Sequence, residues 1–310
     1  MTDTTVDEAT GVPRARSPIV DTTDGGITTR LMVLGLAHED GTVFGTELYP
    51  VAAQCGISVE TVRSCMRRLA TEGLFEREGE GRSAVFHATQ GGMAVLEVDH
   101  QRALLAYAQD LAGRGWDRRW HLLAFAIPES QRTLRDSLRD HVLHLGGAQV
   151  HPGTYASPHG WEADIRAEAE RLGITEHVST WSTDDLSVGA VTDPRQIAAQ
   201  LWDLSAVASL YEGFIESYRA VPQRLEAMRD RRERLTEADF LPGALHMAIR
   251  FNACFEHDPL LPPELLPRPW PGKEAREILA RCRRLGVLNR SEKSGPALFR
   301  VFDDAIAHLP

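Results

Sequence analysis

The pattern that most restricts the fold of this chain lies in residues 46–88, where two short helices are followed by two alternating strands. Gly56 provides a tight turn between the helices, Ser58 is a favourable N-cap for the second helix, and Gly73 ends it. Glycines in the loop 79–83 suit a tight hairpin between the strands. The helices are predicted over residues 46–55 and 59–71, and the strands over residues 74–78 and 84–88. This order is that of a winged helix-turn-helix.

The second predicted helix has one apolar face and one polar face. At 100° per residue its apolar side chains share one arc, which would seat the helix on a small core. The polar face carries arginines, and an arginine can donate two parallel hydrogen bonds to guanine or to a phosphate group. An ordinary amphipathic helix with a solvated basic face would carry the same arginines. The DNA-binding interpretation therefore depends on the glycine turn, the capped helix and the hairpin occurring in this order. The predicted DNA-contacting residues are Ser58, Glu60, Thr61, Arg63, Ser64, Arg67, Arg68 and, in the hairpin loop, Arg82.

The overall charge argues against a protein that coats nucleic acid without regard to sequence. The 310 residues carry a formal net charge of −10, whereas such proteins are basic throughout. Any DNA contact must therefore be local, and dimerisation would raise its affinity. We expect a homodimer that binds an inverted repeat in double-stranded DNA.

Bulk features favour a cytoplasmic protein without a membrane span. There is no run of 18 apolar residues, and the polar, acidic start of the chain lacks the features of a signal peptide. Residues 1–26 are expected to form a disordered arm. Cys55, Cys65, Cys254 and Cys282 are scattered, which favours reduced structural thiols.

The rest of the chain divides into a linker and two further domains. The linker helix (residues 91–115) would carry dimer contacts or act as a plain connector. Elements after Trp116 follow the order β-α-β-β-α-β, which is that of a ferredoxin-like split unit. After Asp193 only helices are predicted, the first over residues 195–219. The predicted domains are 27–90 (winged helix-turn-helix), 116–190 (ferredoxin-like) and 191–310 (helical), an α+β fold.

Three separated segments together resemble the PaaX family of bacterial transcriptional repressors. The first is the predicted helix-turn-helix and its hairpin, and the others lie in the second and third predicted domains. They are Gly56-Ile57-Ser58 to Gly73 with Gly81-Arg82, Trp116-Asp117-Arg118-Arg119-Trp120 with Leu145-Gly146-Gly147 to Pro158, and Asp258-Pro259-Leu260 to Pro271-Gly272. The resemblance implies a winged DNA reader, a Cas2-like middle domain and a helical C-terminal domain. It also implies a dimer that leaves its operator when an aryl- or acyl-CoA thioester binds, phenylacetyl-CoA being the family's example.

The Cas2 likeness raises a metal-dependent nuclease as the alternative function. Such enzymes place an aspartate at the end of the first strand, where it can hold a divalent ion. That position here is Ala126, while Asp117 and Glu129 lie at the wrong ends of the strand. We therefore expect no catalytic residue and no enzymatic activity.

Four histidines between residues 141 and 159 offer a possible zinc site. No cysteine joins them and their spacing matches no structural zinc finger, so solvated or hydrogen-bonded histidines are favoured. They are His141, His144, His151 and His159. No metal ion and no cofactor is expected.

An effector site for a CoA thioester would need cations for the phosphates and an aromatic slot for the acyl group. Arginines beside tryptophans at the start of the second domain offer both, although aromatic side chains also serve simply to join domains. The candidates are Trp116, Arg118, Arg119 and Trp120, with Trp202, Tyr211 and Arg250 from the helical domain.

Overall fold

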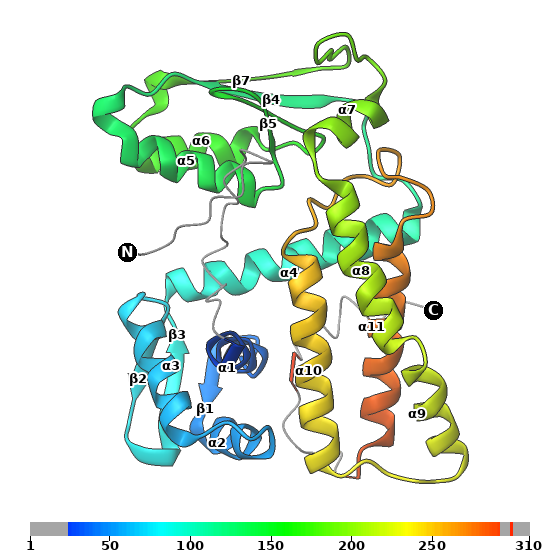
Figure 1. Ribbon diagram of the computed structural model, residues 1–310. Coiled ribbons are helices and arrows are strands. Elements are labelled where there is room, and N and C mark those ends of the chain that lie inside the picture. The colour runs from blue at the N-terminus through cyan, green and yellow to red at the C-terminus, as the bar shows by residue number, and fades with distance from the viewer. Residues whose placement is uncertain (1–23, 292–297, 300–310) are drawn as a thin grey trace, which may run out of the picture.

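The structure, a computed structural model, describes residues 24–291 and 298–299. Most of the predicted arm, and residues 292–297 and 300–310 of the predicted helical domain, lie outside this range. A long helix, α4 (Gln90–Ala112), crosses the middle of the molecule. Figure 1 shows the N-terminal elements below it, a β-sheet layer above it and a group of antiparallel helices beside it.

The N-terminal elements closely follow the predicted pattern. The second of the two predicted helices has the predicted bounds, and the hairpin strands differ by one residue at their starts. A third strand, β1, was not predicted because three residues are too few to show alternation. The elements are α1 (Asp24–Gly35), β1 (Thr42–Phe44), α2 (Gly45–Gln54), α3 (Val59–Thr71), β2 (Phe75–Glu78) and β3 (Val85–Ala88). The strands form an antiparallel sheet in the order β1-β3-β2.

The first turn of helix α4 contains the glycine pair Gly91-Gly92. Both glycines lie inside the helix, whose first turn is capped by the Thr89 hydroxyl accepting from the Gly92 N–H at 3.1 Å. A side chain at Gly92 would collide with the carbonyl oxygen of Leu74. Glycine is therefore required here because the helix starts directly against the backbone that leads into β2.

The central elements confirm the β-α-β-β-α-β prediction. The sheet is antiparallel in the order β5-β6-β4-β7. Strand β4 is buried on both faces, with Leu123 facing α5 and α6 and its neighbour Leu122 in a second core on the opposite face. The elements are β4 (Trp120–Phe125), α5 (Arg132–His144), β5 (Ala148–His151), β6 (Thr154–Ser157), α6 (Glu162–Leu172) and β7 (Val178–Thr183).

The prediction of a single helix over residues 195–219 is wrong, because the structure has two helices there. The break falls where Asp203 caps a new helix by accepting from the Ala206 N–H at 3.0 Å. Trp202 turns into the core and donates from Nε1 to the carbonyl of Gly146 at 3.0 Å. Leu201 and Leu204, on either side of the break, keep the three-residue spacing of one continuous helical stripe, so the sequence did not reveal the break. The helices are α7 (Pro194–Leu201), α8 (Leu204–Tyr218), α9 (Val221–Asp230), α10 (Glu237–Phe255) and α11 (Pro271–Asn289).

The N-terminal elements share a core with the helical part of the chain. Leu241 and Leu245 of α10 are buried in the same cluster as α1, α2 and α3. Among the described residues, no helix has the length and apolar character needed to cross a membrane.

Candidate functional site

Helix α3 is fixed at its start by the predicted cap. The Ser58 hydroxyl accepts from the backbone N–H of Thr61 at 3.1 Å, and the two side-chain oxygens lie 3.0 Å apart. This cap satisfies one of the free N–H groups at the helix start. Ser58 and Thr61 are therefore engaged with each other and hold the first turn of α3 in place.

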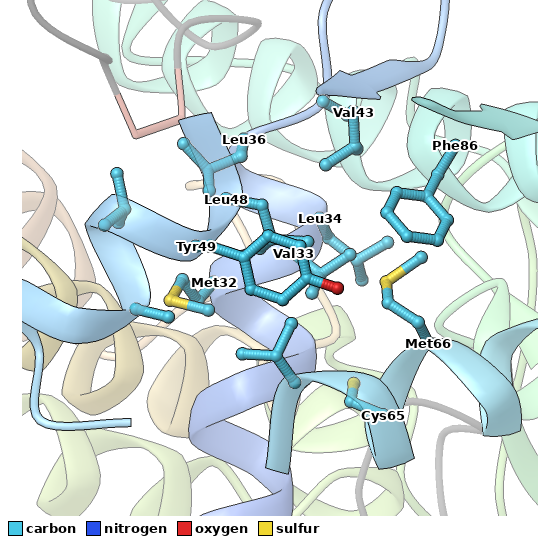
Figure 2. Close-up of a cluster of buried hydrophobic side chains, with 14 of the residues drawn as sticks. Met32, Val33, Leu34, Leu36, Val43, Leu48, Tyr49, Cys65, Met66 and Phe86 are labelled. Atoms are coloured by element: carbon cyan, nitrogen blue, oxygen red, sulfur yellow. The ribbon is translucent and has the colours of Figure 1, made fainter. Parts of the chain in front are cut away.

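The inner face of α3 packs on a core built from the whole N-terminal part. Val62, Cys65, Met66 and Leu69 are buried. Figure 2 shows Cys65 and Met66 pointing from α3 toward side chains of α1 and α2, with Phe86 of β3 beside Met66. This packing explains how one side of the helix is held rigidly while the other is left for contacts.

The outer face of α3 is exposed and basic. Glu60, Arg63, Arg67 and Arg68 are exposed, and Ser64 is partly buried. Within the described part of the chain, Arg63 and Arg67 form no ion pair and their guanidinium groups make no hydrogen bond. Two cations on one helix are thus left without a partner among the described residues.

The loop between β2 and β3 is anchored to the start of α2. The N–H of Gly45, at the start of α2, donates to the carbonyl of Ala84 at 2.8 Å, and a side chain at Gly45 would collide with the carbonyl of Arg82. The Arg82 side chain is exposed and has no ion pair with any described residue. Arg77 on β2 is also exposed and unpaired there, and the sequence prediction missed it because acidic residues flank it on both sides.

The seven predicted effector residues fall into separate places. Trp116, Trp120 and Trp202 come together: the first pair is edge-on at 5.5 Å between ring centroids and the second is stacked at 6.3 Å. Trp120 and Trp202 are buried in the core that joins the sheet to α7. Trp120 and Trp202 therefore serve as packing residues that join the sheet to the helices.

The remaining four predicted effector residues do not complete a pocket with the tryptophans. Arg118 and Arg119 are exposed, and Arg119 donates to the Ser182 hydroxyl at 2.8 Å. Tyr211 is buried in a different core and donates to Asp258 Oδ2 at 2.8 Å. Arg250 is exposed on α10. Only the surface around Trp116, Arg118 and Arg119 keeps the predicted combination of cations beside an aromatic ring.

A cavity of about 420 Å³ lies elsewhere, between α1, α4, α10 and α11. Its volume falls in the range of small-molecule pockets, roughly 300–1,000 Å³. None of the seven predicted effector residues lines it. The sequence offered no signal for it, because its walls also include residues of α8 and α9 and come from helices that are far apart in the chain.

A buried polar cluster ties α4 to the helices on one side of this cavity. Arg276 on α11 donates to both carboxylate oxygens of Asp110 on α4, at 2.6 and 2.9 Å, and lies 3.5 Å from Asp258. Its carboxylate partners raise the pKa of the Arg276 guanidinium despite the opposing effect of burial. Arg102 of α4 donates to the carbonyls of Phe255 and Asp258 at 3.1 and 2.9 Å. The predicted linker is therefore fastened to the helical domain along much of its length.

The four histidines do not form a metal site. Within residues 24–291 and 298–299, no three His, Cys, Asp or Glu side chains gather closely enough to hold a metal ion. Burial lowers the pKa of His141, His144 and His159, and His159 Nε2 lies 2.8 Å from the carbonyl oxygen of Leu260. The four cysteines are free thiols.

The chain is an α+β protein whose central part matches a Cas2-like domain. The model of the PaaX protein central Cas2-like domain matches residues 113–198, and that of the PaaX-like protein C-terminal domain matches residues 202–292. Together these matches span more than half of the 310 residues, so the chain belongs to the PaaX family.

Two further proteins are similar to it. Transcriptional repressor PaaX of Escherichia coli (strain K12) is 24% identical over 243 residues, which are 78% of this chain and 74% of the relative. The solved structure of uncharacterized protein Rv0674 from Mycobacterium tuberculosis is 21% identical and has a TM-score of 0.48 over 84% of this chain and 95% of that chain.

Proposed function

We propose that this protein is a DNA-binding transcriptional regulator of the repressor type. The observation that carries the proposal is the outer face of α3, where Arg63 and Arg67 are exposed and unpaired within the described chain on a helix whose other face is rigidly packed. Such a helix can enter the major groove and donate to base edges and phosphates. The similarity to a protein named as a transcriptional repressor supports the same function.

The winged helix-turn-helix in residues 27–90 is part of this proposal. The order of α1, β1, α2, α3 and the β2–β3 hairpin, with β1 paired to β3, supports it. In this arrangement α3 is the recognition helix, and Arg82 in the wing contacts a neighbouring phosphate or the minor groove. Ser58, Glu60, Thr61, Ser64 and Arg68 lie beside Arg63 and Arg67 on or next to the same helix. Arg77 joins them as a further candidate.

The division of the chain into a reader (27–90), a linker helix (91–115), a Cas2-like domain (116–190) and a helical domain (191–310) is likewise proposed. The reader and the helical domain form one packed unit through α10, whose Leu241 and Leu245 enter the reader's core. A change in the helical domain is therefore transmitted to the reader by direct contact.

A homodimer on an inverted repeat is the form that we propose for DNA binding. The exposed face of α4 carries Ala94, Val98, Gln101, Leu105, Ala108 and Ala112, at the alternating spacing of four and three that is typical of a helix–helix seam. Pairing through this face would place two reader helices on one duplex. It would also supply the affinity that a single acidic chain lacks.

We propose that an aryl- or acyl-CoA thioester, such as phenylacetyl-CoA, or a related small molecule releases the protein from DNA. Arg118 and Arg119 are exposed beside Trp116 and are suited to phosphate groups. Trp120 and Trp202 lie beneath them in the core, and Tyr211 and Arg250 lie elsewhere, so their role in this site would be indirect. Replacing Arg118 and Arg119 by alanine should weaken release by a CoA thioester without weakening ligand-free DNA binding.

A metal-dependent nuclease is not favoured. Strand β4 ends at Phe125 and is followed by Ala126, where the nuclease mechanism needs a carboxylate. Asp117 precedes the strand, and Glu129 follows it and pairs with Arg135 at 2.7 Å. Incubation of DNA and RNA with the protein and magnesium or manganese should leave both uncut.

The experiment that tests the proposed function is selection of bound duplexes from a random DNA pool by the full chain. We expect an enriched inverted repeat whose half-sites are spaced by about one helical turn or a multiple of it. Recovery of unenriched DNA alone would contradict a sequence-specific regulator.

A further inference from the structure

The cavity between α1, α4, α10 and α11 has mostly apolar walls that come from both the reader and the helical domain. Leu31 and Leu34 come from α1, Leu96 and Ala103 from α4, and Phe251 and Leu279 from α10 and α11. Exposed residues Asp239, Gly243 and His246 lie at its edge, so a small molecule can reach it from solvent. Burial of an apolar molecule on these walls would supply the main driving force for binding.

Asp99 contributes a carboxyl group to the cavity wall. Asp99 of α4 is partly buried and makes no hydrogen bond or ion pair with any of the residues that the structure describes. Burial raises the pKa of this carboxyl to about 6; the nearby Arg102 guanidinium opposes this rise, and Glu256 at the end of α10 adds to it. A desolvated carboxylate without a partner is costly, and a ligand that brings a cation would offset that cost.

The cations near Asp99 are committed to other groups. Arg102 donates to the carbonyls of Phe255 and Asp258, and Arg30 of α1 pairs with Glu72 at 2.6 Å. The cationic residues of the cavity wall are engaged as well: Arg276 binds Asp110, and Arg283 donates to the carbonyls of Leu298 and Phe299. An anionic ligand would thus meet an unpaired carboxylate in the cavity.

We propose that this cavity is a binding site for a small hydrophobic amine, whose ammonium group pairs with Asp99 while its apolar body lies between α4, α10 and α11. This site is separate from the surface at Trp116, Arg118 and Arg119, and it takes a ligand of opposite charge to a CoA thioester. The inference does not depend on DNA binding. It depends on the shape of the cavity and on the unpaired carboxylate.

The test is calorimetric titration of the full chain, without DNA, with 4-phenylbutylamine, 4-phenylbutyrate and phenylacetyl-CoA at pH 7.5. The amine should bind at least about tenfold more tightly than the acid of similar shape, because a hydrogen bond to a charged partner commonly contributes about a factor of ten or more. Amine affinity should fall as the pH is lowered from 7 to 5, since protonation of Asp99 removes its charge. Equal binding of amine and acid, or no binding of the amine, would overturn the proposal.

Two variants locate the site. Asp99→Asn should weaken amine binding by about tenfold or more, whereas Glu97→Gln makes the same change on the exposed face of α4 and should leave it unchanged. Ala103→Leu places a larger side chain at the cavity wall and should also weaken binding. Circular dichroism and thermal unfolding check that each variant is folded. If Glu97→Gln weakens binding as much as Asp99→Asn, or if Ala103→Leu has no effect, the amine binds elsewhere and the proposal fails.

Discussion

Arginine side chains in this protein occupy two contrasting environments. On α3, Arg63 and Arg67 are exposed and have no ion pair within the described residues. On α11, the Arg276 side chain is 5% exposed and holds Asp110, whose side chain is 12% exposed. The first environment leaves the charge available to a partner, whereas the second uses the charge to join two helices.

Removal of the buried arginine should cost far more stability than removal of an exposed one. Arg276→Ala would leave Asp110 and Asp258 as buried carboxylates without their cation, which typically costs about 3–5 kcal/mol. The matched control is Arg219→Ala, which removes the partner of Glu274 on the same helix in an ion pair where both side chains are more than half exposed, and should cost at most about 1 kcal/mol. Urea unfolding measures both, and equal losses would contradict the structural role of the cluster.

At the scale of single elements, two glycines that lie inside helices have different surroundings. The first turn of α4 packs so closely on the segment before β2 that only glycine fits at position 92. Gly213 lies inside α8 with no atom near the position that a side chain would take. An added methyl group would therefore collide with the backbone at Gly92 but would meet no other atom at Gly213.

Alanine substitutions at these two glycines should have opposite effects on stability. Gly213→Ala should stabilise the protein by about 0.5–1 kcal/mol, because alanine loses less backbone entropy in a helix. Gly92→Ala should destabilise it, because the new methyl group collides with the Leu74 carbonyl and either the helix start or the hairpin must shift. Thermal unfolding of the two variants gives the signs, and stabilisation by Gly92→Ala would show that α4 does not start as described.

Elements with strong local signals could be predicted from the sequence, and those defined by distant contacts could not. The cap at Ser58 and the apolar arc of α3 gave its bounds, and period-two alternation gave the hairpin strands within one residue. The break at Asp203 was missed because Leu201 and Leu204 keep helical spacing across it, and the hydrogen bond from Trp202 to the distant Gly146 carbonyl leaves no local signal. The cavity at Asp99 depends on helices more than 200 residues apart in the chain, such as α1 with Leu31 and α11 with Leu279, so no local pattern indicates it.

At the scale of the whole molecule, α4 connects every part of the described chain. Its start contacts the N-terminal elements, its middle lines the cavity, and its second half is bonded to the C-terminal helices and the loop between them through Arg102 and Asp110. Its opposite face remains open, with Val98 and Leu105 exposed by 38% and 37%. We expect this face to join two copies of the chain.

A charge on this face should separate the dimer. Val98→Glu combined with Leu105→Glu would place like charges along the seam, and light scattering should change from a dimer to a monomer with the fold intact. Leu210→Glu on α8 is the control, since Leu210 is similarly exposed at 40% but lies off the seam. A parent protein that is monomeric both free and on DNA, or a double variant that remains dimeric, would contradict pairing through α4.

Sequence-specific binding by the outer face of α3 is tested most directly by titrating the selected duplex, at one fixed salt concentration, with three proteins. These are the parent, the variant Arg63→Ala with Arg67→Ala, and the control Arg224→Ala, which removes an exposed arginine of α9. Each arginine that donates to a base edge should contribute about 1–3 kcal/mol, so the double variant should lose at least about tenfold in affinity while the control keeps the parent's value. Equal affinity of the double variant and the parent would contradict DNA recognition by α3.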